Sequence, residues 1–105
     1  MFVRVWRFTV GESDRAAFEA SYGPEGDWAR LFARGDHYLG TELLLGTTGA
    51  HEQGAASYVT IDRWRVEADW LRFLKEHGDE YRALDRRCER LTADETEIGA
   101  FKAVP

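Results

Sequence analysis

The chain has 105 residues, a net charge of -5, and 44% hydrophobic and 31% charged residues, which predicts one globular domain over 1–105. The acidic balance argues against binding to nucleic acid, which needs clustered Lys and Arg. The single cysteine, Cys88, excludes an internal disulfide, and no apolar run approaches the roughly 20 residues of a membrane span. Because charges interrupt the apolar N-terminal stretch, we expect no signal peptide and a cytoplasmic protein that does not bind membranes.

The first third of the chain predicts a strand and then a helix in two pieces. Residues 2–10, FVRVWRFTV, are β-branched and aromatic, which favours a strand with Arg4 and Trp6 on one face. Ser13 is predicted to cap a helix that ends at the glycines and proline of 23–26. Asp27 is then predicted to cap a short second helix, DWARLFARG, with Trp28, Leu31 and Phe32 on its buried side.

The middle of the chain predicts two strands, over 38–46 and 57–65. The segment 46–56 between them is rich in glycine and lacks periodicity, which indicates a surface connection rather than a helix. The two strands therefore form an antiparallel hairpin. One face of the later strand carries four alternating side chains: Tyr58, Thr60, Asp62 and Trp64.

A long helix is predicted over 66–91 and a last strand over 94–104. The helix carries an apolar stripe at spacings of three and four: Trp70, Leu74, His77, Tyr81, Leu84, Cys88 and Leu91. Gly78 lies inside the helix, so we expect a kink near it. Residues 92–95 match a capping box, but the alternation that follows favours a strand.

The order of elements predicts an α+β, ferredoxin-like βαββαβ fold with a four-stranded antiparallel sheet and helices on one face. The other face of the sheet is left bare and is partly apolar. The simplest cover is the same face of a second copy, so we expect a homodimer through the open face of the sheet.

Several segments carry a resemblance to a known family. The opening RVWRFTV, YGPEGDWARLF, YLGTELLL, YVTIDRW and the closing LTADETEIGAF resemble the antibiotic biosynthesis monooxygenase family over nearly the whole chain. The resemblance implies a dimeric α+β barrel. It leaves the reaction open, because the family includes cofactor-independent oxygenases of aromatic polyketides, heme-degrading oxygenases, quinol oxygenases and members of unknown activity.

The resemblance marks candidate site residues. Trp64 matches a tryptophan that the polyketide oxygenases use, Thr60 stands where they have an asparagine, and Trp70 where they have a tyrosine. Arg82 stands for their arginine. Thr60 and Trp70 lack the amide and the phenol, so a mechanism that uses those groups does not carry over. The heme-degrading members use an asparagine in the first strand, which is absent here, and a histidine that lies later in the long helix than His77.

Oxygenation without a cofactor requires a pocket that binds an electron-rich phenol or anthrone, promotes loss of a proton and excludes water. The predicted catalytic residues are His77, as the base titrating near neutral pH, with Trp64 and Arg82. The predicted substrate-binding residues are Trp6, Trp28, Phe32, Tyr58, Thr60, Trp70 and Tyr81. No metal site is indicated, because no pair of histidines or cysteines has the spacing of metal ligands. No nucleotide cofactor is indicated, because no glycine-rich phosphate loop follows a strand.

Structural interpretations of the same residues stay open. His77 is more often a satisfied core histidine than a base, and Trp64 and Trp70 are more often core rings. Two classes of function therefore remain. The first is an enzyme, either a cofactor-independent monooxygenase or another enzyme on the same scaffold such as a cyclase or isomerase, and the second is a non-catalytic dimer that binds a small apolar ligand. Polar side chains such as His77, Tyr81 or Arg82 pointing into the pocket would favour catalysis, and a purely apolar pocket would favour binding.

Overall fold

The computed structural model describes residues 1–48 and 54–105. The strands and helices follow in the predicted order, with the first helix in two pieces: β1 (Phe2–Val10), α1 (Arg15–Tyr22), α2 (Asp27–Phe32), β2 (Tyr38–Leu45), β3 (Ala56–Trp64), α3 (Glu67–Cys88) and β4 (Asp94–Lys102). The surface connection predicted over 46–56 falls partly on residues 49–53, which lie outside the described residues.

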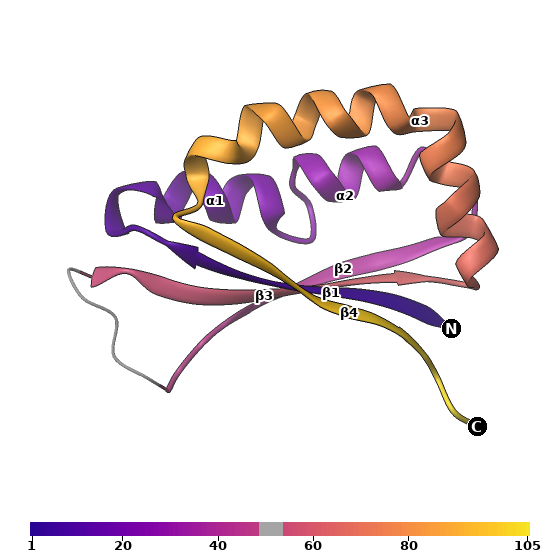
Figure 1. Ribbon diagram of the computed structural model, residues 1–105, viewed down its shortest axis with the longest axis horizontal. Coiled ribbons are helices and arrows are strands. Elements are labelled where there is room, and N and C mark those ends of the chain that lie inside the picture. Colours follow the sequence, from indigo (N-terminus) through magenta and orange to yellow (C-terminus); the bar gives the residue numbers. More distant parts are fainter. Residues whose placement is uncertain (49–53) are drawn as a thin grey trace.

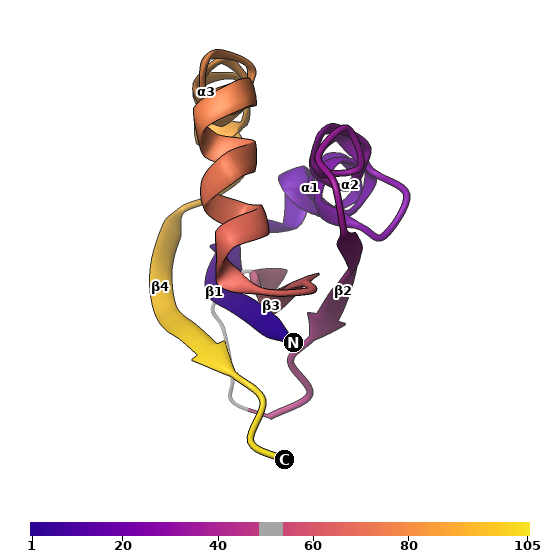
Figure 2. The same cartoon turned by 90° about the vertical axis from the view of Figure 1, so that its right-hand side faces the viewer.

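The four strands form one antiparallel sheet in the order β2-β3-β1-β4. The predicted hairpin of β2 and β3 is confirmed, and the three helices lie together on one face of the sheet (Figures 1 and 2). This is the ferredoxin-like α+β arrangement that the order of elements predicts. Because β1 and β3 pair in continuous register from Phe2↔Trp64 to Val10↔Ala56, their alternate side chains point to the helices together.

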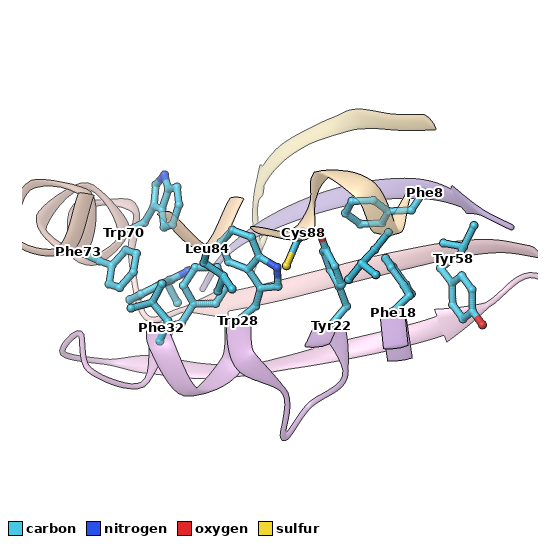
Figure 3. Packing of buried hydrophobic residues seen from close by; sticks show 14 of the residues in the cluster. Phe8, Phe18, Tyr22, Trp28, Phe32, Tyr58, Trp70, Phe73, Leu84 and Cys88 are labelled. Carbon is cyan, nitrogen blue, oxygen red and sulfur yellow. The ribbon is translucent and has the colours of Figure 1, made fainter. Parts of the chain in front are cut away.

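The core lies between the helices and this face of the sheet. Burial alternates residue by residue along β3, and Tyr58 and Trp64 on its inner face are almost fully buried. Rings from α1, α2 and α3 pack against these two side chains. Phe8 of β1 packs on Phe18 and Tyr22 of α1, as Figure 3 shows. Cys88 is buried among these rings, as its position on the helix stripe predicts. The helices therefore pack on the sheet largely through aromatic rings.

The opposite face of the sheet has no helix over it among the described residues (Figure 2). The outward residues of β3, including Val59 and Ile61, are only partly buried. Leu44 on β2 and Ile98 and Phe101 on β4 are exposed by more than two-fifths of their surface. A sheet with apolar side chains on both faces therefore has one face covered and one face open.

Two helix starts differ from the prediction. Ser13 lies inside a short 3-10 turn, Glu12–Asp14, so α1 begins after it, at Arg15, without a side-chain cap. Asp27 is the first residue of α2 rather than its cap, and Gly26 holds the cap position. The Asp27 carboxylate accepts hydrogen bonds from Ser21 and Arg30 instead. Asp27 still lies in the first turn of α2, where negative charge is favourable.

The predicted kink in the long helix occurs at His77, whose φ of -126° and ψ of 21° are not helical. The α-helix ends at Cys88 and continues as a 3-10 turn to Leu91, and the capping-box match at 92–95 precedes a strand, as expected. Among the described residues, no helix is long and apolar enough to cross a membrane. The kink separates the part of α3 that carries Trp70 and Phe73 from the part that carries Tyr81 and Asp85, which line the pocket described below.

Candidate active site

A pocket of about 100 Å³ lies on the inner face of the sheet, beneath the helices. Every strand and helix of the fold contributes to its wall: Arg4, Trp6, Phe8, Tyr22, Trp28, Phe32, Thr41, Thr60, Asp62, Tyr81, Asp85 and Glu95. Of the predicted substrate-binding residues, the structure brings five together here: Trp6, Trp28, Phe32, Thr60 and Tyr81. The pocket therefore combines aromatic walls with several polar groups, a composition typical of small-molecule sites.

The floor of the pocket comes from β1 and β3. Arg4 lies opposite Asp62, and Trp6 lies opposite Thr60, in the register of the two strands. Because side chains directly opposite in antiparallel strands are close neighbours, the floor presents a cation, a carboxylate, a hydroxyl and a ring side by side. Their position follows from the alternation of the two strands, which the sequence predicts.

The helices supply an aromatic roof. Tyr22, Trp28 and Phe32 follow one another along α1 and α2 (Figure 3), with ring centroids 5.8 to 5.9 Å apart. Tyr81 of α3 packs edge-on against Trp28 at 5.1 Å. Burial raises the pKa of the Tyr81 phenol, although nearby Arg4 acts in the opposite direction. The phenol therefore stays protonated at neutral pH and remains a hydrogen-bond donor.

Asp62 is a buried carboxylate, 8% exposed, on the pocket floor. Its Oδ1 accepts a hydrogen bond of 2.6 Å from the Thr41 hydroxyl of β2, which is in turn hydrogen-bonded to the Tyr38 hydroxyl. Burial raises the pKa of Asp62 to about 6, while the bond from Thr41 and the charge of Arg4 oppose this rise. A carboxylate with this pKa is predominantly ionised at pH 7 and accepts a proton more readily than an ordinary aspartate.

Arg4 is held in place by aromatic rings and one acidic partner. Its guanidinium lies 4.2 Å from the centre of the Trp70 ring and 5.8 Å from that of Trp6. Its Nη2 lies 3.3 Å from a carboxylate oxygen of Glu97 on β4. No ion pair joins Arg4 to Asp62 in the described parts of the chain. Arg4 thus supplies positive potential to the pocket without neutralising the carboxylate across from it.

Two further carboxylates line the pocket from α3 and β4. Glu95 has a raised pKa, first because of burial and then because of the negative charges of Asp85, Glu89 and Asp94. Asp85 and Glu95 both contribute to the wall. The pocket wall is therefore electrostatically uneven, with a cation near Asp62 and a group of acidic side chains elsewhere.

Three predicted aromatic residues lie outside this pocket. Trp64 is fully buried, and the rings of Phe32, Tyr38, Trp70 and Phe73 surround it with centroids within 6 Å. Trp70 is in the same cluster and does not line the pocket itself, but its ring contacts the pocket residues Arg4, Phe32 and Tyr81.

Tyr58, the third of these rings, lies near one end of the sheet. Its hydroxyl donates a hydrogen bond to Glu19 and accepts one from Arg15. In this structure Tyr58, Trp64 and Trp70 therefore pack within the core, which is the structural interpretation left open for Trp64 and Trp70.

The polar residues predicted on the helix, His77 and Arg82, are also outside the pocket wall. His77 lies at the kink of α3, where its Nδ1 is 2.9 Å from a Glu80 carboxylate oxygen and its ring is 5.3 Å from that of Phe73. Arg82 projects toward solvent and donates a 2.6 Å hydrogen bond to Asp79. These positions do not support a role for His77 as the base or for Arg82 as a substrate contact in this pocket.

Sequence reasoning did not single out several residues of the wall: Phe8, Tyr22, Thr41, Asp85 and Glu95. Phe8 continues the alternation of Arg4 and Trp6, and Asp85 follows Tyr81 by four residues on one helix face. The spacing of both residues could therefore have predicted that they face the pocket. Thr41 and its neighbour Glu42 are the two strongly polar residues of β2. A register irregularity in β2 between Tyr38 and Gly40 sets its alignment with Asp62, and composition alone does not reveal this.

Comparison with known proteins supports the fold. No protein-family model matches the chain, and no curated protein is similar to it. Among solved structures, the fold resembles SnoaB, a cofactor-independent oxygenase from Streptomyces nogalater, with a TM-score of 0.62 and 24% sequence identity. The similarity covers 99% of this chain and 93% of that one. The two chains therefore share the α+β fold over almost their entire lengths.

Proposed function

We propose that the protein is a cofactor-independent monooxygenase of the antibiotic biosynthesis monooxygenase type, acting on a small aromatic phenol or quinol. The observation that carries the proposal is the aromatic-walled pocket in which Arg4, Asp62 and Tyr81 converge beneath the helices. The full-length fold similarity to SnoaB, itself a cofactor-independent oxygenase, supports the same reaction class.

The reaction draws its electrons from the substrate. Loss of a proton from a phenol, hydroquinone or anthrone gives an electron-rich anion that can reduce O2. For an anthrone, one oxygen atom becomes the new carbonyl and the other leaves as water, so that a CH2 group and O2 yield C=O and H2O. The pocket must hold the flat ring, accept a proton and keep bulk water out. Rings on its roof and floor and a buried carboxylate suit these tasks.

Polar groups within the pocket favour catalysis over simple binding. A pocket that only stores an apolar ligand does not need a buried carboxylate, which costs free energy to bury. Here Asp62 is buried on the floor, with Thr41 as its hydrogen-bond donor and Arg4 as its cross-strand neighbour. This arrangement supports the enzyme rather than the non-catalytic ligand-binding dimer.

Oxygen uptake tests the proposal. Purified, metal-free protein is mixed with a panel of polycyclic phenols, hydroquinones and anthrones, and O2 consumption is followed with an electrode. We expect uptake with at least one ring system and at least a tenfold loss in Trp6→Leu, which removes a ring of the floor. Leu71→Ala, at an exposed position on α3, is the matched control and keeps full uptake. Ligand binding without oxygen uptake across the panel would favour the non-catalytic alternative.

We also propose that a second copy of the chain covers the open face of the sheet. Val5 and Ile61 are neighbours in the register of β1 and β3, and Val3 lies beside the exposed Phe101 of β4. Contiguous apolar side chains of this kind are typical of protein interfaces, and a twofold axis would match the face with itself.

Sedimentation velocity tests the dimer. We expect a dimer for the natural chain and a monomer for Ile61→Lys, which places a charge at the centre of the face. Leu71→Lys introduces the same charge on α3, away from the sheet, and should leave the dimer intact. A natural chain that sediments as a monomer at all accessible concentrations would contradict this part of the proposal.

A further inference from the structure

Asp62 is placed where a bound ring would meet a proton acceptor. It is buried on the pocket floor, between the hydroxyl of Thr41 on β2 and the side chain of Arg4 on β1. Resting on the proposed function, we infer that Asp62 is the general base of this pocket and that Arg4 stabilises the substrate oxyanion formed when the proton leaves.

The hydrogen bonds of Asp62 leave one oxygen for the substrate. Oδ1 accepts the bond from Thr41, and Tyr38 fixes the Thr41 hydroxyl in turn. Among the described residues, none forms a hydrogen bond with Oδ2. Oδ2 is still accessible, because the fully enclosed polar atoms without a partner are the indole nitrogens of Trp28 and Trp64. Oδ2 is therefore the atom that can accept a proton, and Thr41 is a positioning residue that orients the carboxylate.

The contacts of Arg4 leave the Asp62 carboxylate able to accept a proton. Arg4 forms its ion pair with Glu97 and stacks on Trp70, rather than forming an ion pair with Asp62. A direct ion pair would stabilise the carboxylate and weaken it as a base. At its present position, the guanidinium can attract the negative charge that develops on the substrate oxygen after proton transfer.

The proposed step is a proton transfer in which no group is oxidised or reduced. The C–H or O–H bond of the substrate breaks, its proton forms a bond to Oδ2, and its electron pair stays on the substrate and is delocalised to the oxygen near Arg4. Asp62 passes from carboxylate to carboxylic acid. The reaction with O2 follows in a separate step, so proton removal can be measured without oxygen.

The titratable and charged groups that face Asp62 come from three elements. Arg4 of β1 lowers its pKa, and Asp62 in turn raises the pKa values of Tyr38 on β2 and Tyr81 on α3. Both tyrosines keep raised pKa values and stay neutral between pH 5 and 8. Glu95 of β4 also lines the pocket and has a raised pKa, so the Asp62→Asn and Thr41→Val variants are what assign a change in proton abstraction near pH 6 to Asp62.

Deuterium exchange under nitrogen tests the inference. Anthrone is incubated with the full-length protein in D2O buffer, and loss of its methylene proton signal is followed by NMR. We expect the natural protein to accelerate exchange above the buffer rate, with a rate that rises with pH through about 6. Asp62→Asn keeps the shape of the side chain and an acceptor for Thr41, and it should lower the catalysed rate about 100-fold or more.

Thr41→Val is a second variant, and its measured quantity is the pH midpoint of exchange. A purely structural role of Thr41 would leave this midpoint unchanged. Because the Thr41 hydroxyl stabilises the ionised carboxylate, its loss should shift the pH midpoint of exchange upward. Circular dichroism and thermal unfolding of both variants confirm that they are folded. A midpoint that stays unchanged in folded Thr41→Val would count against Asp62 as the titrating base.

The outcomes separate this inference from the proposed function. Exchange that depends on Asp62 but occurs without oxygen uptake would support the base and contradict the monooxygenase. Oxygen uptake together with equal exchange in Asp62→Asn would keep the monooxygenase and overturn the base. Exchange by the natural protein that does not exceed the buffer rate would also overturn the base.

Discussion

Two neighbouring groups of aromatic rings differ in what they enclose. The first, the closed cluster, consists of Trp64, Trp70, Phe73 and Tyr38, and it packs ring against ring. The second, the pocket wall, includes Trp6, Phe8, Trp28 and Tyr81, and its rings leave space beside Arg4 and Asp62. Phe32 contacts both groups. The difference indicates that in this chain buried polar groups, rather than aromatic content, distinguish a site from a core.

The positions that the family resemblance marks differ from most of the positions that line the pocket. The resemblance points to Trp64 and Trp70 in the closed cluster, where Trp64 is fully buried and surrounded by rings. The charged groups Arg4 and Asp62 of the pocket instead lie at positions to which the resemblance assigns no role, although Thr60, which it aligns with an asparagine, also lines the pocket. A site proposed for this chain therefore depends on its own geometry more than on transferred positions.

The largest expected effect separates the two groups by stability. Trp64→Ala should lower the free energy of unfolding by about 3 to 5 kcal/mol, because it leaves a large cavity in packed rings. Trp6→Ala, at a partly exposed position, should lower it by only about 1 kcal/mol. Urea unfolding followed by circular dichroism measures both. Equal losses of stability would remove the distinction between closed cluster and pocket wall.

The next effect concerns Asp62 and pH. Its folded pKa of about 6 lies above the ordinary value of 3.8, so its favourable contribution to stability is present at low pH and is lost as pH rises through 6. At pH 8 the buried charge should cost about 2 to 3 kcal/mol. Asp62→Asn should therefore be more stable than the natural chain at pH 8, and the gain should disappear near pH 3. A gain independent of pH would contradict the raised pKa.

A smaller effect sharpens the role of Arg4. Arg4→Met keeps an apolar stem on Trp70 but removes the charge, so the pKa of Asp62 should rise further. Carbon-13 NMR of the aspartate carboxyl groups follows the titration directly. Arg7→Met is the matched control, because Arg7 is on the same strand but points to the other face of the sheet. An equal shift in both variants would show that Arg4 has no specific influence.

The smallest effect is expected at His77. His77→Gln removes the imidazole that lies beside Glu80 at the helix kink, outside the pocket wall. The rate of proton exchange or oxygen uptake should change by less than about twofold, and the free energy of unfolding by less than about 1 kcal/mol. A tenfold loss of either rate would restore His77 as a candidate base and place the site closer to the closed cluster.

Periodicity in the sequence predicted the fold and part of the pocket. Alternation along β1 and β3 put Trp6 on one face of its strand and Thr60 and Asp62 on one face of theirs, and in the structure these side chains and Tyr81 of the helix stripe line the same pocket. The same stripe includes His77, whose ring lies at the kink beside Phe73 and Glu80 rather than in the pocket wall. Thr41 depends on the register irregularity of β2, a long-range property that local patterns do not encode.

The central claim is that ligands bind at the pocket wall and not at the closed cluster. Each of the four tryptophans has one indole N–H signal in a nitrogen-15 correlation spectrum. On titration with 2-naphthol, we expect the signals of Trp6 and Trp28 to shift most, while the signal of the enclosed Trp64 stays nearly unchanged. Large shifts of Trp64 and Trp70 with Trp6 and Trp28 unmoved would contradict the account.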